Sequence, residues 1–509
     1  MNIVIRADAS IFIGSGHIMR CLVLAEGLKQ QNYNVIFACR RQPGDLVDLI
    51  RKRGFKVHEL SQPKYWMTPV NDHDYSSWLQ VTWQQDADSL LSKLNHVDLL
   101  IVDHYGLNFE WEKYLKVALK CHLFVIDDLV REHYCDLLLD QTLSRTSTEY
   151  TQKGSVNNVL AGCDYALLSS GFSVVRGEIL SSSLASINPV SVKLLLSMGA
   201  IDLPNATMSV LESFSKCIAN ERPKITVLLG SNAPEYKQVK DFCLNNLDWI
   251  THIDYVDNMP RLMTQFDIAV GAAGITSWER ACLGLPCIVI PLAENQRSVC
   301  KKLVAQQAVI KIELDEISNQ LIERYTYLVK NLPAYRLRNL ILCDGLGLKR
   351  VVMELTRLLD GKSNCISLRK ACVEDIHLVY GWQCMETTRL YALNTIKPSF
   401  EQHQRWMLNK LSSVHDYFYI LMDREQNINI GVVRLDRINK AEYVISIFID
   451  SAHFGKRYAS QALAIIDIIH GDSTIHATVL SNNKVSHKLF TSAGYHPLSA
   501  ETYIREPLC

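Results

Sequence analysis

A histidine directly after the first glycine turn has the chemistry and the position of a catalytic acid or base. Residues 2–8 have the apolar pattern of a buried strand, and residues 17–30 have the spacing of a helix. The turn between them, IGSGH, therefore lies at the carboxyl edge of the predicted sheet, where open α/β sheets bind ligands. An imidazole titrates near neutral pH, so His17 is a candidate general base or acid. A histidine that only caps the helix fits the same pattern. The residues that surround His17 are Gly14, Gly16 and, one helical turn further on, Arg20.

Other polar side chains stand where predicted strands of the same series end. Carboxyl ends of parallel strands meet at one edge of a sheet, so residues far apart in the sequence converge there. Single Asp residues at such places often only cap the following helix. Three such ends together favour a polar cleft. The residues concerned are Arg6 and Asp8, then Asp103, His104 and Tyr105, then Asp127 and Asp128.

A second glycine turn, in residues 269–279, has the composition of a nucleotide site. Its amides and hydroxyls suit a diphosphate at a helix N-terminus, and Glu279 can accept hydrogen bonds from ribose hydroxyls. No Walker sequence is present, which argues against ATP hydrolysis. The acidic residue expected about 20 positions after a GxGxxG is also missing, which argues against NAD. Two parallel halves with a glycine turn each predict a cleft between them that holds a nucleotide-sugar. The other residues of this candidate site are Gly274, Ile275, Thr276, Ser277, Asn295 and Gln296.

A third candidate site has a small basic turn before a helix. Such a turn suits a pyrophosphate, here that of coenzyme A. The next helix carries NxxSxxLFxxxGY, which an ordinary amphipathic helix with a glycine cap also explains. The residues of this site are Gly455, Lys456, Arg457, Tyr458, Ala459, Ser460, Asn483, Ser486 and Phe490.

The elements that position these residues fall into three series. Up to about residue 360, apolar strands alternate with helices, which predicts two doubly wound parallel sheets. A long helical pattern over 334–359 closes the second series. Beyond the linker at 360–364, strands follow one another directly, which favours antiparallel pairing. The predicted fold is therefore α/β, two Rossmann-like halves (1–185 and 186–360), followed by an α+β domain (365–509).

Composition excludes several classes of partner. The 509 residues allow about three domains, and 53 basic residues balance 53 acidic ones. That balance argues against nucleic acid or an anionic membrane surface as a partner. We find no signal peptide, no transmembrane run and no CxxC among the fifteen cysteines. We expect a cytoplasmic protein without a metal; the oligomeric state is not determined by the sequence.

Five segments of the first 350 residues together resemble the UDP-sugar hydrolases of pseudaminic acid biosynthesis. These enzymes are relatives of glycosyltransferases with the two-domain GT-B fold. The resemblance implies that water attacks the anomeric carbon of UDP-2,4-diacetamido-2,4,6-trideoxy-β-L-altropyranose, inverts it and releases UDP without a metal. The segments are IRADASIFIGSGHIMRCLVLA (5–25), IVDHYG (101–106), VIDDL with CDLLLD (125–140), SMGAIDLPNAT (197–207) and AAGITSWERACLGLPCIVIPLAENQ (272–296).

The resemblance also implies roles. His17 would assist the water or the departing oxygen, residues 103–105 would form a loop on the sugar side, and the turn at 274–279 would bind UDP. Asn295 and Gln296 match a loop that closes near the phosphates and the sugar. The sequence departs from the family at Ala200 and Ile201, where glycine and threonine are usual before Asp202, and at Ser169, where arginine is expected.

Residues 365–509 resemble the GNAT acetyltransferases, which use acetyl-CoA. Four further residues resemble members that acetylate the 4-amino group of UDP-amino-sugars: Trp382, Arg389, His403 and Trp406. Arg457 replaces the central glycine of the acetyl-CoA loop, and Phe490 stands where many members carry a tyrosine acid. Tyr495, Tyr503 or water would then protonate the leaving thiolate.

The combined resemblance predicts a bifunctional enzyme. Acetylation of a UDP-4-amino-sugar would supply the substrate whose UDP the first two halves remove. Two alternatives remain open at this stage: a GT-B glycosyltransferase that passes the sugar to an acceptor, and a non-catalytic UDP-sugar-binding module with a degenerate acetyltransferase.

Overall fold

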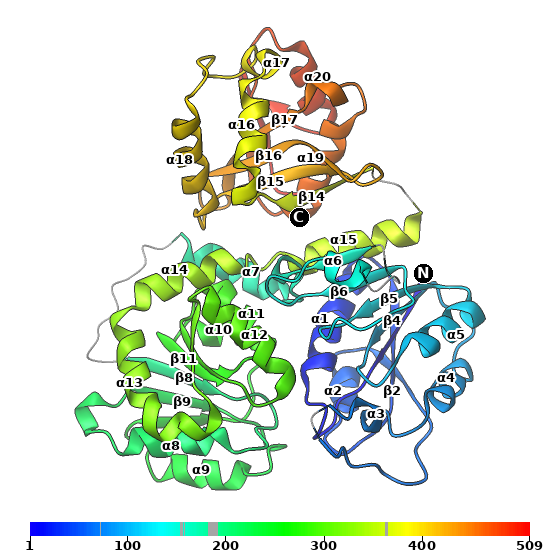
Figure 1. Ribbon diagram of the computed structural model, residues 1–509, viewed down its shortest axis with the longest axis vertical. Coiled ribbons are helices and arrows are strands. Elements are labelled where there is room, and N and C mark those ends of the chain that lie inside the picture. The colour runs from blue at the N-terminus through cyan, green and yellow to red at the C-terminus, as the bar shows by residue number, and fades with distance from the viewer. Residues whose placement is uncertain (72, 153–155, 157, 182–191, 362–364, 509) are drawn as a thin grey trace. The chain divides into compact units, whose positions relative to one another are not determined.

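The computed structural model describes residues 1–71, 73–152, 156, 158–181, 192–361 and 365–508. The chain divides into two compact units (Figure 1). The first unit contains Met1–Arg176 and Ala185–Leu359, and the second contains Gly177–Leu184 and Asp360–Cys509. The boundary expected at residues 185 and 186, and the linker residues 362–364, lie outside the described residues.

The first sheet consists of seven parallel strands. Their order is β3 (Lys56–Glu59), β2 (Asn34–Cys39), β1 (Asn2–Ala7), β4 (Leu99–Asp103), β5 (His122–Ile126), β6 (Leu137–Asp140) and β7 (Val159–Ala161). The helices between them are α1 (Gly16–Gln30), α2 (Val47–Lys52), α3 (Tyr75–Trp78), α4 (Trp83–Leu91), α5 (Phe109–Leu119) and α6 (Thr148–Thr151), and α7 (Ser170–Ile179) follows β7.

The strands of this sheet are apolar throughout because both faces are covered. In β1, Ile3 and Ile5 pack into one core with helix α1, whereas Val4 packs into another core with Trp111 of α5. A strand between two apolar layers has no polar face, which explains the continuous apolar runs of the sequence.

The second sheet is also parallel and has six strands. Their order is β10 (Ile250–Ile253), β9 (Lys224–Leu228), β8 (Lys193–Ser197), β11 (Ile268–Ala272), β12 (Cys287–Ile290) and β13 (Val309–Lys311). The helices of this part are α8 (Ala206–Ser215), α9 (Tyr236–Leu244), α10 (Met259–Met263), α11 (Thr276–Leu283), α12 (Glu294–Ala305), α13 (Ile317–Lys330), α14 (Leu332–Leu342) and α15 (Gly347–Asp360).

The single helix expected over 334–359 is two helices, α14 and α15. The C-cap of α14, Cys343, has an extended backbone (φ −135°, ψ 120°), and Gly345 follows in the connection to α15 with a φ of +77°. Helix α15 then packs against the first sheet: its Val351 and Leu355 belong to the same core as Ile3. The last helix of the first unit thus returns to the sheet on which the chain began.

The second unit is built on a mixed seven-stranded sheet. Its order is β14 (Ile366–Lys370), β15 (Tyr417–Asp423), β16 (Ile428–Asn439), β17 (Glu442–Ile449), β18 (Thr474–Thr478), β20 (Thr502–Arg505) and β19 (His496–Pro497). The helices are α16 (Ile376–Cys384), α17 (Glu386–Arg389), α18 (Phe400–Leu411), α19 (Tyr458–Ile469) and α20 (Lys484–Ser492).

Strands β17 and β18 are the parallel pair of this otherwise antiparallel sheet. Their register ends at Ile445 and Ala477, although β17 continues to Ile449. The predicted fold class is confirmed: two doubly wound parallel sheets precede an α+β domain. Among the residues that the structure describes, no helix is both long and apolar enough to cross a membrane.

Candidate functional site

His17 lies in the first turn of α1, and its imidazole is fixed by a buried carboxylate. Its Nδ1 is 2.5 Å from Oδ1 of Asp103, the last residue of β4. Because an ionised carboxylate only accepts hydrogen bonds, Nδ1 carries the proton and Nε2 keeps its lone pair. Nε2 has no hydrogen-bond partner among the described residues. This arrangement suits a general base.

Arg20 anchors the same carboxylate from one helical turn further along α1. Its guanidinium donates to Asp103 at 2.6 and 2.7 Å, and also to Asp128 at 2.6 Å. Burial alone would raise the pKa of Asp103, but Arg20 and His17 outweigh it and hold that pKa well below its usual range. The Tyr105 hydroxyl donates to Asp128 at 2.8 Å. Three of the residues expected to converge at this edge, Asp103, Tyr105 and Asp128, therefore form one connected network with His17 and Arg20.

Arg6, Asp8 and His104 form a second, fully buried network beside the first. Arg6 pairs with Asp8 at 2.6 Å and with Asp86 of α4 at 2.8 Å. His104 lies 3.3 Å from Asp8, and burial lowers the pKa of this histidine, which keeps it neutral. Side chains this deep support the edge of the sheet; they do not form an open polar surface. Asp86 was not found from the sequence, because a lone Asp in a helical stretch gives no signal.

Three aromatic side chains pack beside His17. Two of them, Tyr75 and Trp78, were not identified from the sequence. The ring of Tyr105 meets the imidazole edge-on, with centroids 4.6 Å apart. Trp78 stacks on Tyr105 at 5.6 Å, and Tyr75 packs edge-on against both, at 4.9 and 5.2 Å. Both added rings come from α3, a single helical turn whose i, i+3 aromatic spacing was the available signal.

The second glycine turn joins β11 to α11, as expected. Helix α11 begins at Thr276, so the backbone amides of its first turn have no partner within the helix. Arg280 ties the turn together by donating to Ala272 O at 2.7 Å and to the hydroxyls of Thr276 and Ser277 at 3.2 Å. Gly271 is required here, since a Cβ would lie 2.4 Å from Ser197 O. The turn is rigid and offers donors for an anion.

Glu279 is held ready for a partner that donates hydrogen bonds. Burial raises the pKa of this carboxyl to about 7, and its Oε2 is buried without a hydrogen-bond partner among the described residues. A buried acceptor without a donor is costly, and a ligand hydroxyl would relieve that cost. The position, one turn inside α11, fits the expected role on a ribose.

The two glycine turns approach each other within the first unit. A Cβ on Gly16 would lie 3.4 Å from Cδ1 of Ile275. The base at His17 and the anion-binding turn before α11 are therefore parts of one region.

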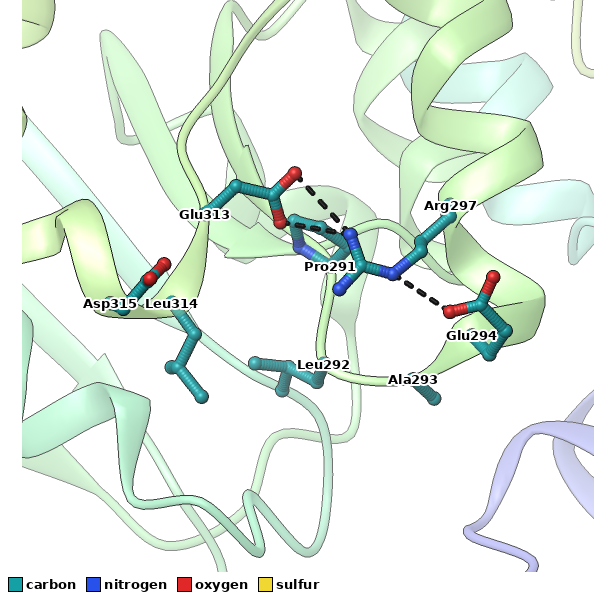
Figure 2. A pocket seen from close by; sticks show the side chains of 8 residues that line it. All are labelled: Pro291, Leu292, Ala293, Glu294, Arg297, Glu313, Leu314 and Asp315. Carbon is teal, nitrogen blue, oxygen red and sulfur yellow. Dashed lines mark hydrogen bonds and ion pairs between the residues drawn. The ribbon is translucent and has the colours of Figure 1, made fainter. Parts of the chain in front are cut away.

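A pocket of about 540 Å³ lies at the ends of β12 and β13 (Figure 2). Arg297 stands in it between Glu294, at 2.8 Å, and Glu313, at 3.1 Å. Gln296 accepts a hydrogen bond from the Leu292 amide at 3.0 Å, which ties the start of α12 to the preceding loop. The side chain of Asn295 lies outside the described residues. The pocket is lined by Pro291, Leu292, Ala293, Glu294, Arg297, Glu313, Leu314 and Asp315.

The unusual residues before α8 preserve a helix cap. Asp202 accepts hydrogen bonds from the amides of Ala206 and Thr207 at 2.9 and 2.8 Å. The replacement of glycine and threonine by Ala200 and Ile201 therefore leaves the local fold intact.

In the second unit, the basic turn precedes α19 in the expected place. Gly455 and Arg457 both have left-handed backbone conformations, with φ of +81° and +60°, and Arg457 is the N-cap of α19. Arg457 thus retains the conformation that a glycine would adopt there. Tyr458 points inward, and its hydroxyl donates to Asp423 at 2.5 Å. Lys456 completes the turn, and Ala459 and Ser460 lie in the first turn of α19.

The helix after β18 uses its candidate residues structurally. Asn483 caps α20 by accepting from the Ser486 amide at 3.1 Å. Phe490 is buried and packs against Tyr495 and Tyr503. Burial raises the pKa of Tyr495 to about 12, whereas the Tyr503 hydroxyl lies 2.7 Å from His487 Nδ1. Because β17 and β18 are parallel, α19 and α20 both begin at the same edge of the sheet.

Contacts link the four remaining candidates of the second unit: the rings of His403 and Trp406 meet with centroids 5.5 Å apart, Trp382 and Trp406 belong to one apolar core, and Arg389 and His403 both bind Gln383. Trp382 donates to Asp450 at 3.0 Å, and His403 is buried between Gln383 and Ile376 O. Arg389 binds backbone carbonyls of the following loop, and Trp406 stacks under Arg434, 4.9 Å from the guanidinium. Among the described residues, no group of three or more His, Cys, Asp or Glu side chains is arranged to hold a metal.

Comparison with known proteins finds matches to two family models, each over part of the chain. Residues 201–338 match the glycosyltransferase family 28 C-terminal domain. Residues 366–496 match the acetyltransferase (GNAT) domain. These matches lie on either side of the predicted linker, so the fusion is confirmed.

Two relatives match longer parts of the chain than these domain models do. An uncharacterized protein of Methanocaldococcus jannaschii is 24% identical over 97% of this chain and 96% of its own length. The UDP-2,4-diacetamido-2,4,6-trideoxy-β-L-altropyranose hydrolase of Campylobacter jejuni is 27% identical over 58% of this chain and 94% of its own length. The resemblance of the first part to such hydrolases is therefore confirmed.

The fold comparison includes MurG of Acinetobacter baumannii. It shares 11% sequence identity, with a TM-score of 0.47, over 70% of this chain and 99% of that protein.

Proposed function

We propose that this chain, which joins a glycosyltransferase family 28 C-terminal domain to a GNAT domain, is a bifunctional nucleotide-sugar enzyme. Its first unit hydrolyses UDP-2,4-diacetamido-2,4,6-trideoxy-β-L-altropyranose to the free sugar and UDP. Its second unit transfers acetyl from acetyl-CoA to the 4-amino group of the UDP-amino-sugar. Both reactions belong to pseudaminic (nonulosonic) acid biosynthesis. The similarity to the Campylobacter jejuni hydrolase supports the choice of substrate.

The observation that carries the hydrolase proposal is the imidazole of His17, fixed at Nδ1 by Asp103 and open at Nε2. Nε2 accepts a proton from water as the water oxygen bonds to the anomeric carbon. The bond from that carbon to the phosphate oxygen breaks, and its electron pair leaves with UDP. Attack from the face opposite the leaving group inverts the anomeric carbon. Asp103 stabilises the imidazolium that forms, because Arg20 and His17 hold the pKa of its carboxyl well below its usual range and so keep it ionised.

The second half of the first unit holds the nucleotide in this proposal. The amides before and within the first turn of α11 bind the diphosphate, and Glu279 accepts from the ribose hydroxyls. The negative charge that develops on the departing phosphate is stabilised by the same amides. The substrate-binding roles of residues 103–105, Asn295 and Gln296 are part of this proposal.

The second unit supplies an acetyl transfer in the same pathway. The turn 453–460 binds the pyrophosphate of acetyl-CoA at the N-terminus of α19, beside the parallel pair β17 and β18. The sugar amine, as a free base, bonds to the thioester carbonyl carbon; the carbon–sulfur bond then breaks, the nitrogen loses a proton and the thiolate gains one. Tyr503, bonded to His487 beside Phe490, is the better placed of the two tyrosine candidates, because the Tyr495 hydroxyl is fully buried.

The test is to follow phosphorus NMR and mass spectra of the full chain with the UDP-4-amino-sugar, with and without acetyl-CoA. Free UDP and a diacetamido sugar, formed only with acetyl-CoA, are the expected products. An acetylated nucleotide-sugar that keeps its UDP would favour the glycosyltransferase alternative for the first unit. If neither the amino nor the diacetamido nucleotide reacts, the binding-module alternative would replace the proposal.

A further inference from the structure

We propose that Tyr75 and Trp78 of α3 determine the specificity of the first unit, and select a sugar whose ring carries methyl groups in place of hydroxyls. This inference rests on the proposed function, because it names what the sugar side of that site prefers. It concerns residues that neither the sequence motifs nor the domain matches include.

The two rings extend an aromatic surface away from the base, of which Tyr75 is the half-exposed part, whereas Trp78 and Tyr105 are only 9% and 6% exposed. Tyr105 contacts His17, Trp78 stacks on Tyr105, and Tyr75 packs edge-on against both, all with centroids within 5.6 Å of the next ring. Trp78 also meets His17 edge-on at 6.2 Å. An anomeric carbon held at His17 Nε2 places the rest of a sugar ring within reach of this surface.

The position of α3 is built into the fold. Gly106 allows it, since a Cβ there would lie 2.6 Å from the carbonyl oxygen of Tyr75. Gln42 donates to Trp78 O at 3.0 Å, and Asp74 caps the short helix by accepting from the Ser77 amide. Several specific contacts thus fix the position of this single helical turn, which packs against the base.

The segment before α3 is also anchored and carries apolar side chains at its surface. Gln80, itself buried, accepts from the Met67 amide at 2.7 Å and donates to Met67 O at 2.8 Å. Tyr65 and Val70 are 85% and 84% exposed, and Trp66 is 53% exposed. Exposed apolar side chains on an anchored loop are typical of ligand contact.

The chemistry of the surface indicates which sugar it accepts. Aromatic rings gain from burying methyl groups and lose when they cover hydroxyls that need water. A 2,4-diacetamido-2,4,6-trideoxy sugar carries three methyl groups, at two acetamido substituents and at C6. UDP-N-acetylglucosamine has one acetamido group and keeps the hydroxyls at C4 and C6. The aromatic surface therefore favours the first sugar.

The decisive variant is Tyr75→Ala, because Tyr75 is half-buried and its loss does not open the core. We expect KM for the diacetamido nucleotide-sugar to rise about tenfold, as one apolar contact typically discriminates. The Kd of UDP alone should stay within about twofold, since the second half binds it. Trp78→Ala should also weaken the binding of the diacetamido nucleotide-sugar. Trp78→Phe, which keeps a stacked ring, should retain most of that affinity. Tyr114→Ala removes an exposed ring of α5 and is the matched control.

Two results would overturn the inference. One is an unchanged KM in Tyr75→Ala; the other is an equal loss of UDP affinity, which would mean general damage. If the wild-type chain releases no UDP at all, the hydrolase proposal fails, and equilibrium binding then tests the inference separately. The diacetamido nucleotide should bind more tightly than UDP-N-acetylglucosamine, and Tyr75→Ala should remove that difference. Equal affinities in the wild type would refute it.

Discussion

The two nitrogens of His17 have different surroundings, and the proposed chemistry depends on that difference. Nδ1 is bound to Asp103, while Nε2 has no partner among the described residues. A carboxylate fixed by Arg20 therefore sets both the tautomer and the direction of the ring. The histidine alone, without this partner, would be only a residue near a turn.

Replacement of the histidine tests the base directly. His17→Ala should lower kcat for UDP release by about 10²–10⁴-fold, the usual contribution of a general base. The Kd of UDP, measured by calorimetry, should not change, because α11 and Glu279 lie in the other half. Loss of UDP binding in the variant would show that His17 holds the structure and does not act in the reaction.

Glu279 predicts a pH dependence of nucleotide binding. Its pKa is raised to about 7 by burial, so the carboxyl is mostly protonated at pH 6 and mostly ionised at pH 8. Only the ionised form accepts hydrogen bonds with both oxygens from ribose hydroxyls. We therefore expect UDP affinity to rise by up to about tenfold between these pH values.

Glu279→Gln is the control for this measurement, because its amide oxygen accepts hydrogen bonds but does not titrate. UDP has the same phosphate ionisation with either protein, so calorimetry on both isolates the carboxyl. Identical pH profiles for the two proteins would contradict the role assigned to Glu279.

At the scale of the element, the turn before α19 combines one glycine and one arginine in left-handed backbone. A residue with a Cβ in this conformation costs about 1–2 kcal/mol, so Arg457 is held there at a cost. Gly455, with φ of +81°, avoids the cost.

Two substitutions separate backbone from side chain in this turn. Gly455→Ala should destabilise the second unit by about 1–2 kcal/mol and raise KM for acetyl-CoA. Arg457→Gly should unfold at the same or a higher temperature, since it relieves strain. Thermal unfolding and acetyl-transfer kinetics of both variants provide the measurements. If Gly455→Ala matches the wild type in both, the turn does not depend on its left-handed geometry.

Element boundaries show where sequence patterns reach their limit. The apolar pattern over 334–359 is continuous, yet residues 343–346 divide it into α14 and α15. Helix α15 packs on the first sheet. Periodicity cannot reveal this, because an apolar helix face does not indicate which sheet it packs against. Helix α3 is too short for a periodic signal, so its two rings were not assigned to the site.

At the scale of the whole molecule, the two reactions should be separable by single substitutions. With the UDP-4-amino-sugar and acetyl-CoA, His17→Ala should accumulate the acetylated nucleotide-sugar. Gly455→Ala should acetylate slowly but still release UDP from added diacetamido nucleotide at the wild-type rate. Mass spectrometry of the products checks both expectations. The loss of both activities through either substitution would contradict two independent sites.

The sequence by itself determined the fold class and the resemblance to two kinds of enzyme. Continuous apolar strands between helices require a parallel sheet with both faces covered, and closely spaced strands after residue 365 require antiparallel pairing. Both expectations follow from the local periodicity of apolar residues, which is visible within a short window of the sequence. The glycine turns next to His17, Glu279 and Gly455 are local patterns as well.

Tertiary structure alone decided what those residues contact. Arg6 and Asp8, expected in a polar cleft, are fully buried in ion pairs, and Asn483 caps a helix. The pairing of His17 with Asp103 joins residues 86 positions apart. The rings of Tyr75 and Trp78 pack on Tyr105, which is likewise distant from them in the sequence. Such contacts arise from the packing of whole sheets and helices, so no local pattern encodes them.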